Sequence, residues 1–216
     1  MAKYFNTTAS GQVKTGAGKI HGVIVNSHSS GTLRFNDGLS GTTSAGVKAT
    51  GVLTASGVFS DGETITVSDG STTIVYTMKT ALTGAAYEVL IGASAAASLD
   101  NLKSAINGSA GEGTTYGIGT PASPIFTATT NTDTAQTIEA NRIGTYANSF
   151  TTTETCANAA WGAATMENGA ESSLLIANTY TLPSGSQVIS FPEPIDFYSG
   201  LYYTEGGTAD VTIIYS

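Results

Sequence analysis

One stretch of the chain, residues 94–107, spaces its apolar residues as a helix does. The steps of four, three and four residues place its apolar side chains on one face of a 3.6-residue period: Ala95, Leu99, Leu102 and Ile106. Ser94 or Ser98 can cap the first turn, and Gly108 can adopt the left-handed conformation that ends a helix. A helix of this length is marginal alone, so we expect its apolar face to pack on a sheet.

Most other apolar residues alternate with polar ones, which is the period of a strand with one buried face. The main predicted strands are residues 19–26, 32–36, 64–67, 72–78, 87–91, 125–130, 135–140, 174–182, 187–191, 200–204 and 209–215. Residues 1–18 predict an extended arm or an edge strand. Residues 39–57 hold few large side chains and predict either a linker or a weak strand.

Turn residues suggest how these strands connect. Residues 27–31 predict a hairpin between strands 19–26 and 32–36, and Asp69-Gly70 predicts a type I′ hairpin turn. A turn is also expected at Pro183 and Gly185. Pro-Glu-Pro at 192–194 predicts an extended segment outside the hydrogen-bond ladder. We expect one sheet, built from residues 64–78 and 125–140, to lie under the helix.

The strands fall into two ends and a middle of different texture. Neither end has enough strands to be stable alone, whereas together they supply about six. Because loop tips tolerate insertions, we expect the ends, residues 1–50 and 171–216, to form one antiparallel β-sandwich domain. Residues 51–170 are then an inserted small α+β module that carries the helix 94–107. The predicted fold class is mainly β.

Composition narrows the functional classes. Charged residues make up only 11% of the chain and the net charge is −8, which disfavours a nucleic-acid partner. A weakly charged surface suits contact with other protein subunits. Basic residues gather before residue 50, and acids follow Arg142 without further bases. Either the two ends neutralise each other, or a basic N-terminal arm meets an acidic neighbouring subunit.

Cellular location follows from what the sequence lacks. The single cysteine, Cys156, offers no disulfide framework within one chain. The first residues contain no apolar secretion signal, and no apolar run of membrane-spanning length occurs. We expect a soluble protein made in a reducing cytoplasm.

Several stretches of the middle resemble a small module that recurs in structural proteins of tailed bacteriophages. They are SDGETITVS (60–68), IVYTMKT (74–80), LIGASAAASLDNLKSAIN (90–107), GTTYGIG (113–119), IGTYANS (143–149) and TETCANAAWGAATM (153–166). The flanks resemble small phage virion proteins in HGVIVNSHSSGTLRFNDG and in the ending from YTLPSGSQVISFPEP to GLYYTEGGTADVTIIYS.

The resemblance implies a virion component that decorates or cements the capsid of the head. Its partners would be the major capsid protein or other virion subunits, with the chain as a homo-oligomer on the particle. The alternative is a tail, fibre or baseplate component that contacts host-surface glycans.

No residue pattern predicts catalysis, a cofactor or a metal. His21 and His28 have no clustered ligands nearby in sequence. Asp61-Gly62-Glu63 and Asp69-Gly70 fit turns better than a calcium site, which needs a dense set of oxygens. A G-x-S-x-G nucleophile elbow is absent. The acids that could serve as paired carboxylates by residue type alone are Glu63, Glu88, Glu139 and Glu154. We therefore expect no enzyme.

Contact with other subunits is expected at two places. Tyrosine suits interfaces because its ring is apolar and its hydroxyl can bond to water. The candidates are Lys3, Tyr4, Phe5 and Lys14 in the N-terminal arm, and Phe197, Tyr198, Tyr202 and Tyr203 near the C-terminus. The C-terminal group could instead be a sandwich edge with its tyrosines alternately in and out. Trp161 is expected in the core of the module, beneath the helix.

Overall fold

The computed structural model describes residues 1–182 and 185–216, without the side chains of Ser30 and residues 177–179. The chain forms two compact units: unit 1 comprises Met1–Gly46 and Glu171–Ser216, and unit 2 comprises Val47–Ala170. The chain therefore passes from unit 1 to unit 2 between residues 46 and 47, four residues earlier than the domain boundary predicted between residues 50 and 51. The turn expected at Pro183 lies outside the described residues. Among those residues, no helix is long and apolar enough to cross a membrane.

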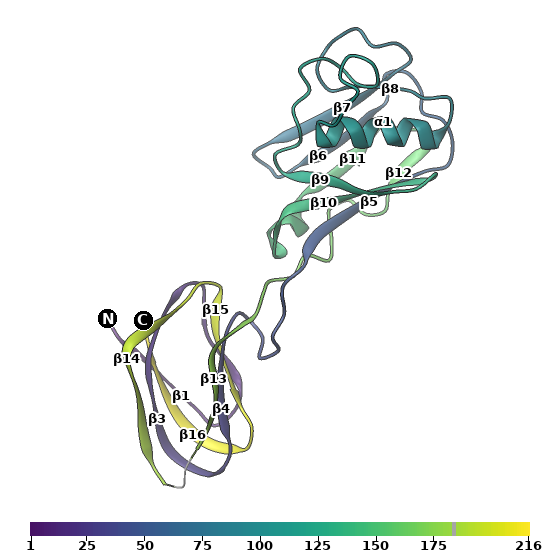
Figure 1. Cartoon of the computed structure of the whole chain (residues 1–216). Helices are drawn as coiled ribbons and strands as arrows, with labels where there is room; N and C mark the ends of the chain where they lie inside the picture. Colours follow the sequence, from purple (N-terminus) through teal and green to yellow (C-terminus); the bar gives the residue numbers. More distant parts are fainter. Residues whose placement is uncertain (183–184) are drawn as a thin grey trace. The chain divides into compact units, whose positions relative to one another are not determined.

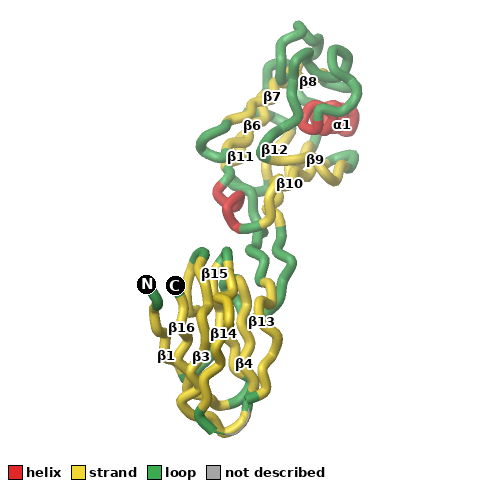
Figure 2. The backbone as a smooth tube through the Cα atoms, turned by 60° about the vertical axis from the view of Figure 1, so that its left-hand side comes forward, coloured by secondary structure: helices red, strands yellow, loops and turns green. Residues whose placement is uncertain are grey.

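Unit 1 is a β-sandwich of two four-stranded sheets (Figures 1 and 2). The first sheet has the order β1 (Lys3–Thr7), β16 (Thr208–Tyr215), β3 (Gly18–Ser30), β14 (Gln187–Phe197). The second has the order β13 (Leu174–Thr181), β4 (Thr32–Asp37), β15 (Gly200–Glu205), β2 (Gly11–Thr15). Both sheets contribute to one core, which includes Val23, Val25 and Ile213 from the first and Leu33 and Phe35 from the second. A mainly β fold with antiparallel sheets and one α-helix is thus confirmed for the described residues.

The hairpin predicted between residues 19–26 and 32–36 is wrong. β3 pairs with β16 and β14, whereas β4 pairs with β13 and β15 in the opposite sheet. The chain crosses between sheets at Gly31, whose φ of 151° suits glycine. A β-carbon there would lie 3.0 Å from the Gly206 carbonyl oxygen. The alternation of side chains shows which face of each strand is buried, but it does not choose the strand's partner.

The N-terminal residues are structural parts of the sandwich. β1 is the edge strand of the first sheet and β2 is an edge strand of the second. Val13 on β2 is 8% exposed and belongs to the core. Removing residues 2–12 would therefore delete β1 and the start of β2. Removal of a flexible arm would leave the fold intact, but this deletion would not. The segment predicted at residues 192–194, extended and outside the ladder, lies within β14: the strand continues to Phe197, and its register with β3 breaks between Ser190 and Ile195.

Unit 2 consists of two further four-stranded sheets and the helix. One sheet has the order β12 (Ala159–Trp161), β5 (Lys48–Ala55), β10 (Ala135–Ile143), β9 (Phe126–Asn131). The other has the order β11 (Thr151–Glu154), β6 (Thr64–Ser68), β7 (Thr73–Lys79), β8 (Glu88–Leu90). β8 runs parallel to β7. A 3-10 helix, Thr145–Ser149, precedes β11.

β5 decides between the two interpretations of residues 39–57. It is an internal strand between β12 and β10, and Ala49, Leu53 and Ala55 are buried along it. Its small side chains therefore mark close packing in unit 2. The turn at Asp69-Gly70 differs from a two-residue type I′ turn, because Ser68 and Thr73 are the last paired residues and four residues form the loop.

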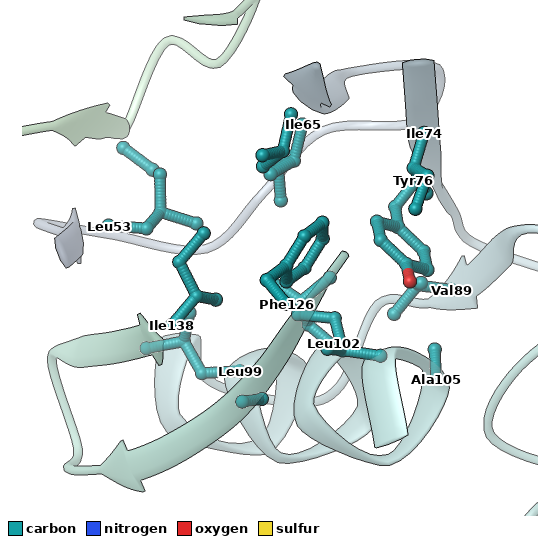
Figure 3. Close-up of a cluster of buried hydrophobic side chains, with 14 of the residues drawn as sticks. Leu53, Ile65, Ile74, Tyr76, Val89, Leu99, Leu102, Ala105, Phe126 and Ile138 are labelled. Atoms are coloured by element: carbon teal, nitrogen blue, oxygen red, sulfur yellow. The ribbon is translucent and has the colours of Figure 1, made fainter. Parts of the chain in front are cut away.

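The helix α1 (Ala95–Asn107) matches the sequence prediction closely, including both caps. Ser94 accepts a hydrogen bond from the Ala97 N–H, and Gly108 has a φ of 59°. Leu99, Leu102 and Ile106 are buried, and Ala95 is partly buried against the same core. In Figure 3, Leu99 and Leu102 lie beside Phe126 and Ile138 within this core.

The expectation of a single sheet beneath α1 is wrong. Strands β6 and β7 lie in one sheet, whereas β9 and β10 lie in the other. The helix contacts β8 and β9, the edge strands of the two sheets. It therefore closes one side of the space between them, as Figure 1 shows. Apolar burial on both sheets gives a 13-residue helix the support that it lacks alone.

The side chains of two asparagines hydrogen-bond the helix to the edge strands β8 and β9. The Asn107 amide nitrogen donates to the Ala128 carbonyl (2.8 Å), and the Ala128 N–H donates to the Asn107 amide oxygen (2.9 Å). Asn101 donates to the Leu90 carbonyl of β8 at 2.8 Å. Edge strands carry unpaired backbone groups that need partners, so the helix supplies polar as well as apolar contacts.

We expect Asn107→Ala to lower the free energy of unfolding of unit 2 by about 1–3 kcal/mol, because a donor and an acceptor of β9 lose their partners. Chemical denaturation followed by the fluorescence of Trp161, the only tryptophan, measures the change. Asp100→Ala, on the exposed side of the same helix, serves as the control and should change the value by less than about 0.5 kcal/mol. Equal effects of the two substitutions would contradict a role of Asn107 in holding the edge.

Candidate interaction surfaces

An apolar band crosses the outer face of the sheet β1-β16-β3-β14 in unit 1. Register places Tyr4 opposite Ile214, and Ile24 opposite Val188. Ile214 pairs with Gly22, two residues before Ile24, so the two pairs are diagonal neighbours. Tyr4 and Val188 are each 68% exposed. We call Tyr4, Ile24, Val188 and Ile214 the apolar band.

The band exists because three of these strands carry apolar residues on both faces. Val23 and Val25 point into the sandwich on either side of Ile24, and Val211 and Ile213 do so before Ile214. A sheet with one solvent face would normally carry polar residues at the outward positions. Polar groups border the band: Asn6 and Thr212 stand in the same cross-strand row as Ile24 and Val188. Asp210 accepts hydrogen bonds from the side chains of Asn6 (2.8 Å) and Asn26 (3.2 Å). The apolar positions are therefore local to one part of the face.

The predicted N-terminal contact residues separate in the structure. Tyr4 belongs to the apolar band and Lys3 is exposed beside it on β1. Phe5 points the other way and packs against the core. Lys14, on β2 in the second sheet, lies over the Phe197 ring with its nitrogen 5.6 Å from the ring centroid. Of this group only Tyr4 lies on the face that holds the band, because side chains alternate along β1 and Lys3 shares the side of Phe5.

The predicted C-terminal contact residues separate as well. Phe197 and Tyr203 are 1% and 0% exposed, so their side chains belong to the sandwich core and cannot form a contact surface. Tyr202 is partly exposed and lies on the opposite face from Tyr203, as the alternating interpretation proposed. Tyr198 is 76% exposed in the turn between β14 and β15.

Asp37 holds the turn that presents Tyr198. Its buried carboxylate accepts hydrogen bonds from the backbone N–H groups of Tyr198 (2.8 Å), Ser199 (2.7 Å) and Gly200 (3.3 Å). Such charge-assisted bonds are strong in a buried setting. The sequence predicts a turn at Asn36-Asp37-Gly38, but it does not indicate this contact, because the bonded N–H groups are more than 160 residues away.

A second surface feature is an open groove in unit 2 with a volume of about 440 Å³. It is lined by residues 152–154 of β11 and by residues 161–164, which begin at the end of β12. Trp161 is partly exposed there, and its indole N–H donates to the Thr153 carbonyl at 3.2 Å. The same side chain lines a small internal cavity together with Leu102 and Ile106 of the helix. Trp161 thus packs against the core as expected, but it also forms a wall of the groove.

The acids considered for chemistry are engaged in local structure. Glu63 accepts from the N–H groups of Ser60 and Ala157, both at 2.8 Å. The Thr83 hydroxyl, followed by its backbone N–H, holds the pKa of Glu88 below its ordinary value. Glu139 pairs with Lys48 at 3.0 Å. Hydrogen bonds from Thr80 and Lys79 lower the pKa of Asp61.

The remaining candidate groups are similarly placed. Burial, with help from Glu63 and Glu154, raises the pKa of the Cys156 thiol to about 12, so it is a poor nucleophile near neutral pH. His21 lies 3.0 Å from the Ser216 hydroxyl. Within residues 1–182 and 185–216, no three His, Cys, Asp or Glu side chains are grouped to hold a metal ion.

Comparison with known proteins finds no matching family model, no matching curated protein and no matching solved structure.

Proposed function

We propose that the chain is a non-enzymatic structural protein of a tailed-bacteriophage virion, which decorates or cements the head by binding major capsid protein subunits. The resemblance of both the middle and the flanks to phage structural proteins supports the virion assignment. The low content of charged residues, 11%, supports a surface that contacts other subunits.

The apolar band carries the docking part of this proposal. Exposed apolar side chains that adjoin one another mark protein contacts more often than single ones do. The band begins at β1, an edge strand whose ladder with β16 runs through five residue pairs without a register break. An incoming strand of a capsid subunit could extend the sheet at β1 and cover Tyr4. The opposite edge strand, β14, is less suited because Pro192 and Pro194 lack N–H groups.

Cementing follows from binding only the assembled shell. A protein that contacts two neighbouring capsid subunits stabilises the assembled state over the dissociated state by mass action. Repetition by the symmetry of the particle multiplies many modest contacts. In this proposal unit 1 binds the capsid and unit 2 is a separately folded module carried on it.

Mass spectrometry of purified particles should find the chain at high copy number with the head. Labelled antibodies should bind tail-less heads, whereas a tail, fibre or baseplate component would label only tails. Absence of the chain from virions would refute the proposal.

The double variant Tyr4→Ser, Val188→Ser should reduce copies per particle by at least about tenfold, because it removes both exposed ends of the band. Quantitative mass spectrometry of particles measures the copies. Val75→Ser, at a 40% exposed valine of unit 2, is the control and should leave the copy number unchanged. A folded double variant that still occupies heads at the wild-type level would show that the band is not the docking surface.

A further inference from the structure

We infer that the groove beside Trp161 in unit 2 binds a neutral saccharide, with a sugar ring against the indole and sugar hydroxyl groups at Glu154. This site is separate from the apolar band and does not depend on head binding by unit 1. Its volume of about 440 Å³ falls within the range of small-ligand sites. It is open on one side, as recognition of a sugar within a longer chain requires.

The indole of Trp161 is held in place before any ligand arrives. Its N–H donates to the Thr153 carbonyl at 3.2 Å. It also lies close to the backbone of Gly51, where a β-carbon would come within 3.4 Å of the indole atom Cζ3. A rigid aromatic surface binds at a low entropic cost. The C–H groups on one face of a pyranose ring suit the electron-rich surface of an indole.

The polar side of the groove suits hydroxyl groups. The Glu154 carboxylate lines it, and its Oε2 accepts from the Trp161 backbone N–H at 3.4 Å. An ionised carboxylate offers about four acceptor positions, so Glu154 retains capacity for sugar O–H donors. Thr153 also lines the groove and is exposed. Gly162, Ala163 and Ala164 also line the groove, and their side chains are small.

The lining favours a sugar over other ligand classes. It contains one acid and no basic residue, which opposes phosphates and nucleic acid. An extended peptide would need free backbone groups for strand addition. Two N–H groups of the groove are already engaged: Thr152 N–H donates to the Ala164 carbonyl at 2.9 Å, and Gly162 N–H donates to the Val52 carbonyl at 2.9 Å. Side chains therefore provide the polar contacts.

The fluorescence of Trp161 tests this directly, because no other tryptophan contributes to the signal. Cellotriose, maltotriose and chitotriose are titrated into the full chain up to about 20 mM, a range suited to weak sugar binding. We expect a saturable change in emission with at least one of the three, and none with tetraalanine. Glu154→Gln should weaken that binding by at least about fivefold.

Controls make the outcome decisive. Asp133→Asn removes one exposed carboxylate from the β9–β10 turn of the same unit and should bind as the wild type does. Trp161→Phe, followed by calorimetry, should bind more weakly, with circular dichroism showing that it is folded. No response to any of the three sugars overturns the inference. An equal response to tetraalanine, or sugar binding that is unchanged in both Glu154→Gln and Trp161→Phe, also overturns it.

Discussion

Leu102→Asp should unfold unit 2 and leave unit 1 folded. Leu102 is 1% exposed and lies at the centre of the helix face that packs between the two sheets of unit 2. The substitution removes a buried leucine side chain, which alone costs about 2–5 kcal/mol. It also places a carboxylate in an apolar site without a partner, which adds several kcal/mol more. The sum is comparable to the whole stability of a domain.

Separate cores explain why unit 1 should survive. The buried apolar residues of unit 2 form one cluster, and those of unit 1 form another with no member in common. A red shift in Trp161 emission should report the unfolding of unit 2. Amide hydrogen exchange should show retained protection in strands β3 and β16 of unit 1.

Ser104→Asp is the matched control for this experiment. It introduces the same charge into the same helix, but at a partly exposed position. We expect it to change the stability of unit 2 by no more than about 1 kcal/mol. If Leu102→Asp abolished protection in both units together, the division of the chain into two independently folding units would be wrong.

Asp37→Ala should have the second largest effect, now in unit 1. The carboxylate is 7% exposed and accepts three backbone N–H bonds from residues 198–200. Its removal leaves those donors unpaired at the junction between β14 and β15. Because each unpaired buried donor costs about 1–3 kcal/mol, and water will reach some of them, we expect a loss of about 3–5 kcal/mol.

Hydrogen exchange in β4 and β15 measures this loss, while Trp161 emission should stay unchanged because Trp161 lies in unit 2. Asp196→Ala is the control. Asp196 pairs with Lys19 at 2.7 Å, but both side chains are about half exposed, so its removal should cost no more than about 1 kcal/mol. Equal losses in the two variants would show that the turn does not depend on Asp37.

The two units present different kinds of surface. In unit 1 the apolar band lies next to an open edge strand, which suits docking against a protein. In unit 2 the helix and its asparagines occupy the edges at β8 and β9, and the exposed feature is the groove at Trp161. Protein docking by unit 1 and sugar binding by unit 2 can therefore be tested with variants that do not affect each other.

The candidate surfaces could be predicted from the sequence only in part. The abundance of tyrosine near the C-terminus drew attention to Tyr198, which is exposed, but also to Tyr203, which is buried. Both are tyrosines in the same short stretch of sequence, so composition cannot tell which side chain is exposed and which is buried. The sequence did not indicate that Ile24 and Val188 face outward, because strands 19–26 and 187–191 carry apolar residues on both faces. The register of β3 with β14 and β16 is what identifies Ile24 and Val188 as outward-facing.

Local signals in the sequence were enough to determine the helix and most strands. The helix face, the Ser94 cap and Gly108 depend on residues within a few positions of one another, and helical period and capping are short-range effects. Only the tertiary structure decided which strands pair, that β3 and β4 part into opposite sheets, and that the helix joins two sheet edges. Strand pairing and helix placement depend on contacts between residues far apart in the chain, which together enclose two separate cores. The contacts of Asp37 with Tyr198 and of Asn107 with Ala128 are examples. Side-chain alternation is the same for any partner strand, so the sequence pattern alone could not decide the pairing.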